Sequence, residues 1–452
     1  MIAFYKQLYM NIPQTSYPRV VIIGGGFGGV ALAKKLAKQE MQVVLLDKHN
    51  YHTFQPLLYQ VSTGGLEPDS IAYPIRKILS KYPNFYFRLA NVETVDAAEN
   101  TIHTDIGPLK YNYLVLATGS STNFFGNKEI EANSMIMKTV PEALNLRSLI
   151  LENFEEALLT DSIDRQDALM NFVIVGAGPT GVELAGALAE IKRGILPKDY
   201  PDLDTRRAQI NIVQSGDMIL KGMSSQASKK AEDYLEELGV NIWKNTRVTG
   251  YDGDLVTTNT DLNFNTATLI WAAGVKGETV KGIDAKDCIT FSNRFKVNNF
   301  NKVEGYDTIF AIGDVACMTS EAYPHGHPMV AQVAIQQGKH LGENLVNFIE
   351  ANKSMKPFTY KDKGTMATVG RNKAVVDMPK YKFQGMFAWF VWMFVHLFFL
   401  IGFRNRVVVF TNWVYNYIRF DREARLIIRP YKKQRAALLR ELDNKPKDIE
   451  MS

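Results

Sequence analysis

Two glycine-rich turns constrain the fold of this 452-residue chain more than any other feature. The first follows the apolar segment 19–23 and precedes an alanine-rich stretch. It carries the spaced glycines Gly24, Gly26 and Gly29. A second apolar segment, 42–46, ends at Asp47. The order strand, glycine turn, helix, strand and acid is typical of a dinucleotide-binding βαβ unit.

The residue types of this first turn suit a dinucleotide chemically. Glycines let the backbone approach a pyrophosphate, and the start of the following helix favours negative charge. Asp47 is expected to accept hydrogen bonds from the adenosine ribose. An ordinary glycine-rich turn between a strand and a helix is the alternative interpretation. The predicted cofactor contacts of this turn are Gly24, Gly26, Phe27, Gly28, Gly29, Asp47 and Lys48.

The same pattern recurs after residue 170. An apolar segment, 171–175, leads into glycines at fingerprint spacing, and a further strand is expected over 209–213. Two fingerprints predict two dinucleotides, one in each of two domains. A flavin bound permanently at one turn and a nicotinamide visiting the other, with hydride passing between them, is the economical interpretation. The predicted contacts here are Gly176, Gly178, Pro179, Thr180, Gly181 and Gln214.

Gln214 occupies the acid position of the second fingerprint. A carboxylate there would bind the ribose 2′-hydroxyl of NADH and repel the 2′-phosphate of NADPH. A neutral amide lacks that repulsion, so the sequence predicts oxidation of NADPH alongside NADH. In the alternative interpretation, Gln214 lies outside the ribose site.

Three further strand ends carry small residues that allow close approach of a cofactor. The strands expected at 113–116, 269–271 and 308–312 end in such residues. Asp314 is expected to reach the ribityl or pyrophosphate part of the flavin, or alternatively to cap a helix. The residues predicted at these ends are Ala117, Thr118, Gly119, Ala273, Gly274, Gly313 and Asp314.

A helix is expected over 328–339, and it places Gln332 and Gln336 one turn apart on one face. Two uncharged amides in that position are suited to hydrogen-bonding a quinone carbonyl, whereas the alternative makes them surface glutamines. Ala331 and Gln332 join the predicted cofactor contacts. Helices are also expected over 71–80 and 141–160.

Residues 385–403 form an aromatic-rich run without formal charge, followed by Arg404, Arg406, a second aromatic segment over 407–420 and a basic tail from Arg422. The run is just long enough to span a bilayer. Because Trp, Tyr and basic side chains favour the water–lipid interface, we expect these segments to lie on the membrane surface. A spanning helix and a buried or dimer-forming helix are the alternatives.

Charge and cysteine content exclude several classes. The net charge of +5 is modest, and no basic arm with interleaved aromatics indicates nucleic acid. Cys288 and Cys317 form no CxxC pair, so no disulfide framework or metal site is predicted and a reducing compartment is expected. The segment 1–18 does not match a secretory signal.

The order of these motifs, including Phe54-Gln-Pro-Leu-Leu-Tyr, Ala331-Gln-Val-Ala-Ile-Gln-Gln and Gly364-Thr-Met-Ala-Thr-Val-Gly, closely resembles the type II NADH:quinone oxidoreductases over about residues 18–430. The resemblance implies an α/β fold of two Rossmann-like domains with a C-terminal membrane-associating helical region. It implies non-covalent FAD, a quinone acceptor and a homodimer. We place the enzyme as a peripheral membrane protein on the cytoplasmic face of a prokaryotic cell membrane.

The resemblance also assigns domains and roles. Residues 1–140 and 281–350 are expected to bind FAD, 141–280 to bind NAD(P)H, and 351–452 to anchor and dimerise the protein. The family's glutamate near nicotinamide and flavin falls on Glu183, and its quinone-site glutamines on Gln332 and Gln336. A family lysine falls on Lys380 or Lys382, and Lys382 is carried as the candidate. Gln214 departs from the Glu of many members.

Three rivals remain from the sequence. A disulfide reductase of this fold needs a redox-active cysteine pair, which the chain lacks. A sulfide:quinone oxidoreductase needs cysteines close to the flavin, and Cys317 lies near Asp314 while Cys288 is distant in sequence. A non-catalytic redox-sensing flavoprotein, with the aromatic segment as a partner site, is the third.

Overall fold

The computed structural model describes residues 10–283, 289–290, 292–419, 422 and 424–428. The chain forms two compact units. Unit 1 comprises Met1–Thr53, Ala72–Ser121 and Val275–Lys363, and unit 2 comprises Phe54–Ile71, Thr122–Gly274 and Gly364–Ser452. The domain boundaries expected from the sequence stay predictions. Cys288 and most of the basic tail lie outside the described residues.

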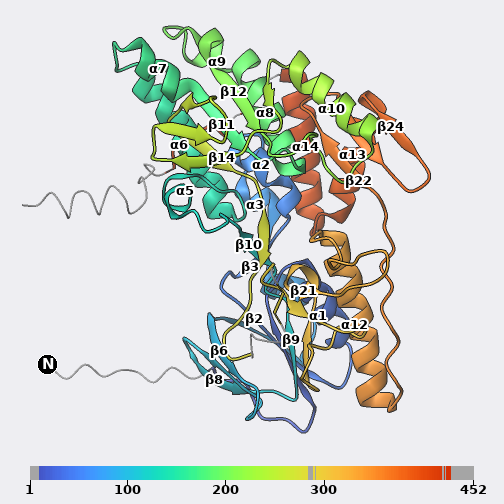
Figure 1. The fold of residues 1–452 in the computed structure, drawn as a ribbon. Helices are drawn as coiled ribbons and strands as arrows, with labels where there is room; N and C mark the ends of the chain where they lie inside the picture. The colour runs from blue at the N-terminus through green and yellow to red at the C-terminus, as the bar shows by residue number, and fades with distance from the viewer. Residues whose placement is uncertain (1–9, 284–288, 291, 420–421, 423, 429–452) are drawn as a thin grey trace, which may run out of the picture. The chain divides into compact units, whose positions relative to one another are not determined.

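Unit 1 is built on a parallel five-stranded sheet (Figure 1). Its order is β20 (Ile309–Ala311), β9 (Tyr113–Leu116), β1 (Arg19–Ile23), β2 (Gln42–Asp47) and β5 (Phe85–Leu89). Alternate residues of β1 enter two cores: Val20 and Ile22 lie in one, Val21 and Ile23 in the other. Burial on both faces explains the continuous apolar run that β1 shows in the sequence.

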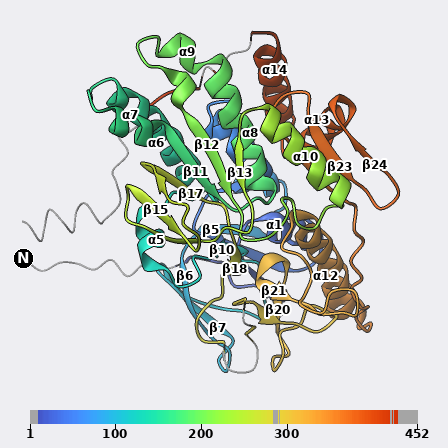
Figure 2. The same ribbon diagram turned by 45° about the horizontal axis from the view of Figure 1, so that its top comes forward.

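Two helices cover one face of this sheet. α1 (Phe27–Leu36) and α12 (Ala331–Ala351) run side by side in both ribbon views (Figures 1 and 2). A β-carbon at Gly338 would stand 2.4 Å from the carbonyl oxygen of Gly28, so glycine permits this backbone contact. The remaining elements of unit 1 are β3 (Tyr51–Thr53), β4 (Ala72–Pro74), α4 (Ile75–Leu79), β6 (Val92–Asp96), β7 (Thr101–Thr104), β8 (Gly107–Lys110), β19 (Phe295–Lys296), η3 (Gly313–Val315) and β21 (Ala316–Cys317).

The prediction of one helix over 71–80 is wrong. α3 (Pro68–Ile71) ends there, β4 pairs antiparallel with β3, and only Ile75–Leu79 is helical again. Pro74 explains the break, because proline lacks the N–H of a helix interior and restricts the residue before it.

Unit 2 contains a parallel four-stranded sheet (Figure 2). Its order is β13 (Asn241–Trp243), β12 (Gln209–Val213), β11 (Asn171–Val175) and β17 (Thr268–Trp271). α8 (Pro179–Gly194) follows the second glycine turn, and the helix predicted over 141–160 is α6 (Val140–Ala157). The remaining elements of unit 2 before residue 275 are η1 (Gln55–Leu57), α2 (Leu58–Ser62), α5 (Lys128–Asn133), α7 (Ile163–Met170), α9 (Leu196–Asp199), η2 (Thr205–Arg207), α10 (Ser225–Glu237), β14 (Val248–Tyr251), β15 (Leu255–Thr258) and β16 (Phe264–Asn265). β18 (Val275–Gly277) belongs to unit 1 and pairs with β10 (Ser120–Thr122).

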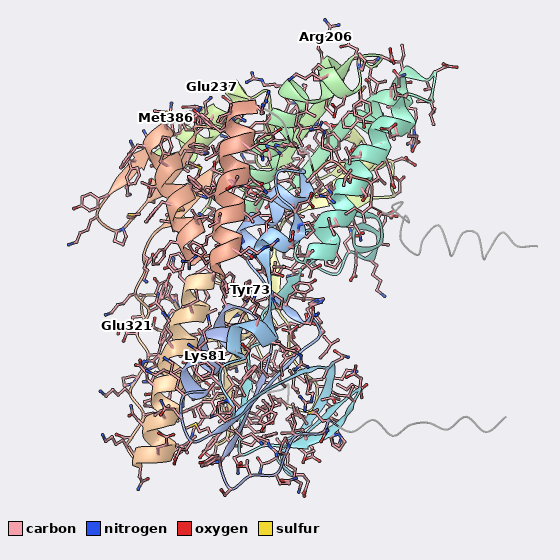
Figure 3. All side chains as sticks on the ribbon, turned by 180° about the vertical axis from the view of Figure 1, so that it is seen from behind. Tyr73, Lys81, Arg206, Glu237, Glu321 and Met386 are labelled. Atoms are coloured by element: carbon pink, nitrogen blue, oxygen red, sulfur yellow. The ribbon has the colours of Figure 1, made fainter. Side chains whose placement is uncertain are left out.

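The C-terminal part of unit 2 begins with the meander β22 (Thr365–Thr368), β23 (Ala374–Asp377) and β24 (Lys382–Gln384). The aromatic run is divided into α13 (Met386–Phe399) and α14 (Phe403–Arg419), adjacent in Figure 3, where Met386 marks the start of α13. Across the described part of the chain, no helix combines the length and hydrophobicity needed to cross a bilayer.

Candidate functional site

The first glycine turn joins β1 to α1 and requires glycine at two positions. Gly24 has φ +109°, and a β-carbon there would stand 2.2 Å from the carbonyl oxygen of Ala117. A β-carbon at Gly29 would stand 1.9 Å from the oxygen of Gly24. At Gly26 the space is open, because a β-carbon there would have no protein atom within 4 Å apart from those of its chain neighbours. The backbone is thus packed from behind and free on the side where a pyrophosphate would approach.

The Asp47 side chain hydrogen-bonds the backbone of this turn. Its Oδ2 accepts the Gly25 N–H at 2.5 Å, and its Oδ1 accepts the His49 N–H at 2.7 Å. Lys48, the next residue, is exposed. A carboxylate with both oxygens bound to backbone is fixed in orientation, which places its remaining lone pairs beside the turn.

The second turn repeats this geometry in unit 2. Gly176 has φ +100°, and its β-carbon would stand 2.9 Å from the Cα of Ala273. At Gly181 a β-carbon would stand 2.0 Å from the oxygen of Gly176, while the space at Gly178 is open. Pro179 and Thr180, in the first turn of α8, are exposed. Ala273 therefore has the packing role here that Ala117 has at the first turn.

Gln214 occupies the position of Asp47 at the second turn. Its Oε1 accepts the Ala177 N–H at 3.0 Å, and Ala177 stands between two glycines as Gly25 does. Two cations nearby in sequence already have partners, because Arg206 pairs with Asp204 at 2.7 Å and Arg207 with Asp167 at 2.5 Å. This placement of Gln214 suits a side chain that faces the ribose. The Gln214 amide brings no charge to that position.

Gly313 and Asp314 lie beside the end of β9 in unit 1. Gly313 has φ +73°, and Asp314 lies inside η3, whose N-cap is Ile312, so Asp314 does not cap a helix. Asp314 Oδ2 accepts the Ser120 hydroxyl at 2.6 Å. At the neighbouring strand end, the Thr118 hydroxyl donates to the Glu278 oxygen, and Gly119 has φ +76°.

Gln337 is a residue that the sequence reasoning missed. Its Oε1 accepts the Gly313 N–H at 2.7 Å, its side chain is fully buried, and its Nε2 has no hydrogen-bond partner. Helical periodicity held the signal, because Gln337 shares the buried face of α12 with Val333 and Ala334. Gln337 therefore supports the Gly313 turn.

Gln332 and Gln336 lie on one face of α12, as predicted, immediately after Ala331. Gln336 Nε2 donates to the Lys361 oxygen at 2.9 Å, and its Oε1 accepts the Lys361 N–H at 3.1 Å. Gln332 Oε1 accepts the Lys363 N–H at 3.1 Å. Both amides thus contact the backbone of the segment that precedes β22.

Glu183 is a buried acid in unit 2. It lies on α8 with 7% of its surface exposed, and its Oε1 accepts the Thr368 N–H at 3.4 Å. Burial raises the pKa of Glu183 to about 8, because an apolar environment disfavours the ionised form, so the side chain is protonated at neutral pH.

Glu183 lines a polar cavity of about 110 Å³, which we call the Glu183 chamber. Its polar wall comprises Tyr59, Gln60, Glu183, Glu190, Thr368, Arg371, Asn416, Tyr417 and Arg422. Arg422 pairs with Glu190 at 2.7 Å, and the Trp413 indole donates to Gln60 at 2.7 Å. A polar space of this size is large enough for several water molecules.

Trp392, which the sequence reasoning also missed, faces the same chamber. It is 1% exposed, and its indole N–H acts on Glu183, where it favours the ionised carboxylate and opposes part of the effect of burial on the pKa. Lys380 and Lys382 are exposed, and Lys382 pairs with Asp377 in the β23–β24 register. Neither lysine is among the residues that line the chamber.

An apolar groove of about 480 Å³ lies between α13 and α14. It shares Trp389, Met393, Trp413 and Tyr417 with the Glu183 chamber. Its other residues are Phe390, Phe394, Leu397, Phe410, Val414 and Ile418. The polar chamber and the apolar groove thus share one wall within unit 2.

The two turns fit dinucleotides. Gly26 and Gly178 are the N-caps of α1 and α8, neither cap makes a side-chain hydrogen bond, and neither first turn carries an acid. Helix N–H groups and the positive dipole end are therefore available to a pyrophosphate at each turn. Among the described residues, no group of three or more His, Cys, Asp or Glu side chains is placed to hold a metal.

Comparisons with known proteins show which sequences this chain is similar to. Residues 18–338 match the pyridine nucleotide-disulphide oxidoreductase family, and residues 363–422 match the NDH2 C-terminal domain. The type II NADH:quinone oxidoreductase Ndh of Mycobacterium tuberculosis is 34% identical, over 88% of each chain.

Solved structures show the same fold. NDH2 of Plasmodium falciparum in complex with NADH matches with a TM-score of 0.83 at 21% identity, covering 91% of this chain and 100% of that one. The sulfide:quinone oxidoreductase of Aquifex aeolicus matches with 0.68 at 21% identity, covering 89% and 95%. Taken with the family match and the M. tuberculosis relative, this chain belongs to the type II NADH:quinone oxidoreductases.

Proposed function

We infer that the chain oxidises NADH and reduces a quinone to a quinol through FAD, without pumping protons. The observation that carries this is the presence of two equivalent dinucleotide turns, one in each unit, in a chain of this family. The reaction balances as NADH + H⁺ + quinone giving NAD⁺ + quinol. One proton must therefore come from the protein or solvent in each turnover.

We assign FAD to the first turn and NADH to the second. Asp47 and the N–H groups of α1 bind the adenosine ribose and pyrophosphate of FAD, and Asp314 binds its ribityl or pyrophosphate region. Gln214 and the N–H groups of α8 do the same for NADH. Held by these residues, FAD would supply the two-electron redox chemistry between NADH and the quinone.

The protonated Glu183 supplies a proton for quinol formation in this proposal. It faces the Glu183 chamber, where water connects it to Glu190 and Arg422, both partly exposed. The quinone tail occupies the apolar groove between α13 and α14, which shares a wall with the chamber. Gln332 and Gln336 stay the candidates for hydrogen-bonding the quinone carbonyls, and Lys382 stays the candidate lysine for the quinone.

The protein is membrane-associated, as its family is. We propose that α13 and α14 lie on the membrane surface, because they carry many exposed apolar side chains, several of which also line the apolar groove. These are Met386, Phe387, Phe390, Phe394, Phe398, Phe403, Val407, Phe410, Val414 and Ile418. We propose a homodimer on the cytoplasmic face of a prokaryotic cell membrane.

Cofactor release and steady-state kinetics test the function. Purified protein is expected to release FAD on denaturation and to oxidise NADH with a short-chain quinone as acceptor. Release of FMN, or NADH oxidation that does not depend on the quinone, contradicts the proposal. Adding sulfide in place of NADH distinguishes the sulfide:quinone alternative.

Point substitutions on α13 test the proposed membrane-binding surface better than deletion of the helix does. Removing α13 would uncover Tyr59, against which Trp392 packs with ring centroids 6.5 Å apart. Phe394→Glu together with Phe398→Glu should reduce binding to anionic vesicles, because these side chains are 70% and 60% exposed. Leu159→Glu, changed at an 87% exposed site just after α6, is the matched control. Equal binding of both variants contradicts the assignment.

A further inference from the structure

His52, in β3, is a buried histidine directly behind the first glycine turn. It is 2% exposed, and its Nδ1 lies 3.0 Å from the carbonyl oxygen of Gly25. A carbonyl only accepts, so Nδ1 carries the hydrogen and donates. Nε2 therefore holds a lone pair, and it is buried without a hydrogen-bond partner.

The surroundings keep this imidazole neutral and fixed. Its ring meets the edge of Phe27, the first residue of α1, at a centroid distance of 4.9 Å and an interplanar angle of 86°. Burial lowers the pKa of His52 to about 4, and the positive charge of Lys34 acts in the same direction. At neutral pH, His52 is a single-tautomer hydrogen-bond donor.

Both backbone polar groups of Gly25, the N–H and the carbonyl, are thus hydrogen-bonded to side chains. Asp47 accepts its N–H at 2.5 Å, and His52 donates to its carbonyl oxygen. Together these two bonds fix the peptide planes between Gly24 and Gly26, and with them the direction of the following N–H groups.

We propose that His52 is a positioning residue for FAD, which holds the Gly25 carbonyl so that the N–H groups of the turn face the pyrophosphate. The inference rests on the assignment of FAD to this turn. His52 touches the turn and acts on the cofactor through it. Neither the family resemblance nor the motif spacing pointed to this residue.

The second turn shows why the contribution is specific to FAD. There the equivalent carbonyl, that of Ala177, accepts the backbone N–H of Leu220 at 2.7 Å. A side-chain substitution removes the donor at the first turn but not at the second. Loss of His52 should therefore weaken FAD and leave NADH binding to the loaded enzyme unchanged.

Apoprotein titrated with FAD, followed by flavin fluorescence, tests the proposal. His52→Phe keeps a buried ring but leaves the Gly25 carbonyl unpaired, so the Kd for FAD should rise about tenfold or more. His52→Asn places an amide N–H near the position of Nδ1 and should restore most of the affinity. His327→Phe is the matched control, because His327 is 4% exposed with an unpaired Nδ1 but has no contact with the turn.

Three outcomes overturn the proposal: a wild-type Kd for His52→Phe, no recovery in His52→Asn, or an equal loss in His327→Phe. If His52→Phe does not fold, histidine NMR of the wild-type holoprotein decides. The Nδ1–H tautomer at neutral pH supports the proposal, and an Nε2–H tautomer contradicts it. FMN in place of FAD on denaturation would instead contradict the proposed function.

Discussion

The two glycine turns have the same geometry but different partners. At the first, the central peptide is held by Asp47 and His52, one charged and one titratable side chain. At the second, Gln214 and the backbone of Leu220 hold the equivalent peptide with neutral groups. The turn that we assign to a resident cofactor thus depends on ionisable side chains, whereas the turn assigned to a visiting substrate does not.

The helices that follow the turns differ at one chemically important position. Two residues after the last glycine of each fingerprint, α1 carries Ala31 and α8 carries Glu183. The Ala31 β-carbon stands 3.3 Å from where a β-carbon at Gly338 would lie, so its small size permits the contact with α12. Glu183 lines a polar chamber instead. At this position one helix packs closely against its neighbour, whereas the other directs a buried acid to the chamber.

The largest effect is expected from adding a methyl group at the third glycine of each fingerprint. Gly29→Ala and Gly181→Ala each place a β-carbon within 2.0 Å of a backbone oxygen, and backbone has little room to yield. Each should destabilise its own unit by about 3 kcal/mol. Flavin content should fall only in Gly29→Ala, and NADH affinity should fall most in Gly181→Ala. Thermal melting, flavin absorbance and NADH titration measure these.

Gly26→Ala and Gly178→Ala are the matched controls for this pair. Neither position has a protein atom within 4 Å of the added carbon, so the melting temperature should hardly change. Each methyl group should still obstruct the approach of its dinucleotide. If all four variants lose the same stability, the open space at the second glycine has no functional meaning.

Acid pH should affect the first turn and spare the second. The pKa of His52 is about 4 in the folded chain and about 6.5 in an unfolded one, so only the unfolded state takes up a proton between these values. Stability falls as the pH drops from about 6.5 to 4, by up to about 3 kcal/mol. FAD should therefore be released on acidification.

The measurement is flavin fluorescence of the holoenzyme between pH 7 and 4, in wild type and in His52→Asn. The variant removes the titrating group and should retain FAD to lower pH. Buried His396, whose pKa is also lowered to about 4, weakens unit 2 in both proteins and so cancels in the comparison. Identical release curves contradict the assignment.

Features carried by local sequence were predictable. Both turns, their flanking strands and the placement of Gln214 follow from short-range patterns, in which the residue types themselves dictate the backbone. The break at Pro74 was missed because β4 forms by pairing with distant β3, which overrides the apolar periodicity of residues 71–80.

The tertiary parts of the site were not predictable in the same way. Trp392 lies about two hundred residues from Glu183 in sequence, and nothing local to either residue signals that both line one chamber. The bond from His52 to Gly25 depends on β3 folding back behind the turn. Contacts of this kind require the three-dimensional arrangement of the elements, which residue spacing does not encode.

Gln214→Glu should make the second turn resemble the first. The carboxylate can accept the Ala177 N–H as Asp47 accepts that of Gly25, so NADH oxidation should be largely retained. A charge facing the 2′-phosphate should lower kcat/KM for NADPH about tenfold or more relative to NADH. The ratio of the two kcat/KM values in wild type and variant measures the effect.

Gln214→Leu is the control for this ratio. It removes the acceptor and leaves the Ala177 N–H unpaired, so kcat/KM should fall for both nucleotides together. An unchanged ratio in Gln214→Glu would mean that the side chain does not face the ribose, although it holds the turn.

The smallest effect concerns Glu183, which stands where α1 carries Ala31. Its effect on the pH dependence of stability is opposite in sign to that of His52. The pKa of Glu183 is raised to about 8, so the folded protein keeps a proton that the unfolded chain loses near pH 4.5. Stability therefore falls as the pH rises toward 8 and levels off above it. Between pH 7 and 9 the loss should amount to about 1 kcal/mol.

Glu183→Gln cannot titrate, so its melting temperature relative to wild type should rise up to pH 8 and then stay constant. Glu131→Gln, on an exposed part of α5, controls for removal of one carboxylate. A difference between Glu183→Gln and wild type that is independent of pH would mean that the chamber hydrates Glu183 enough to ionise it, and that its proton is not held for the quinone.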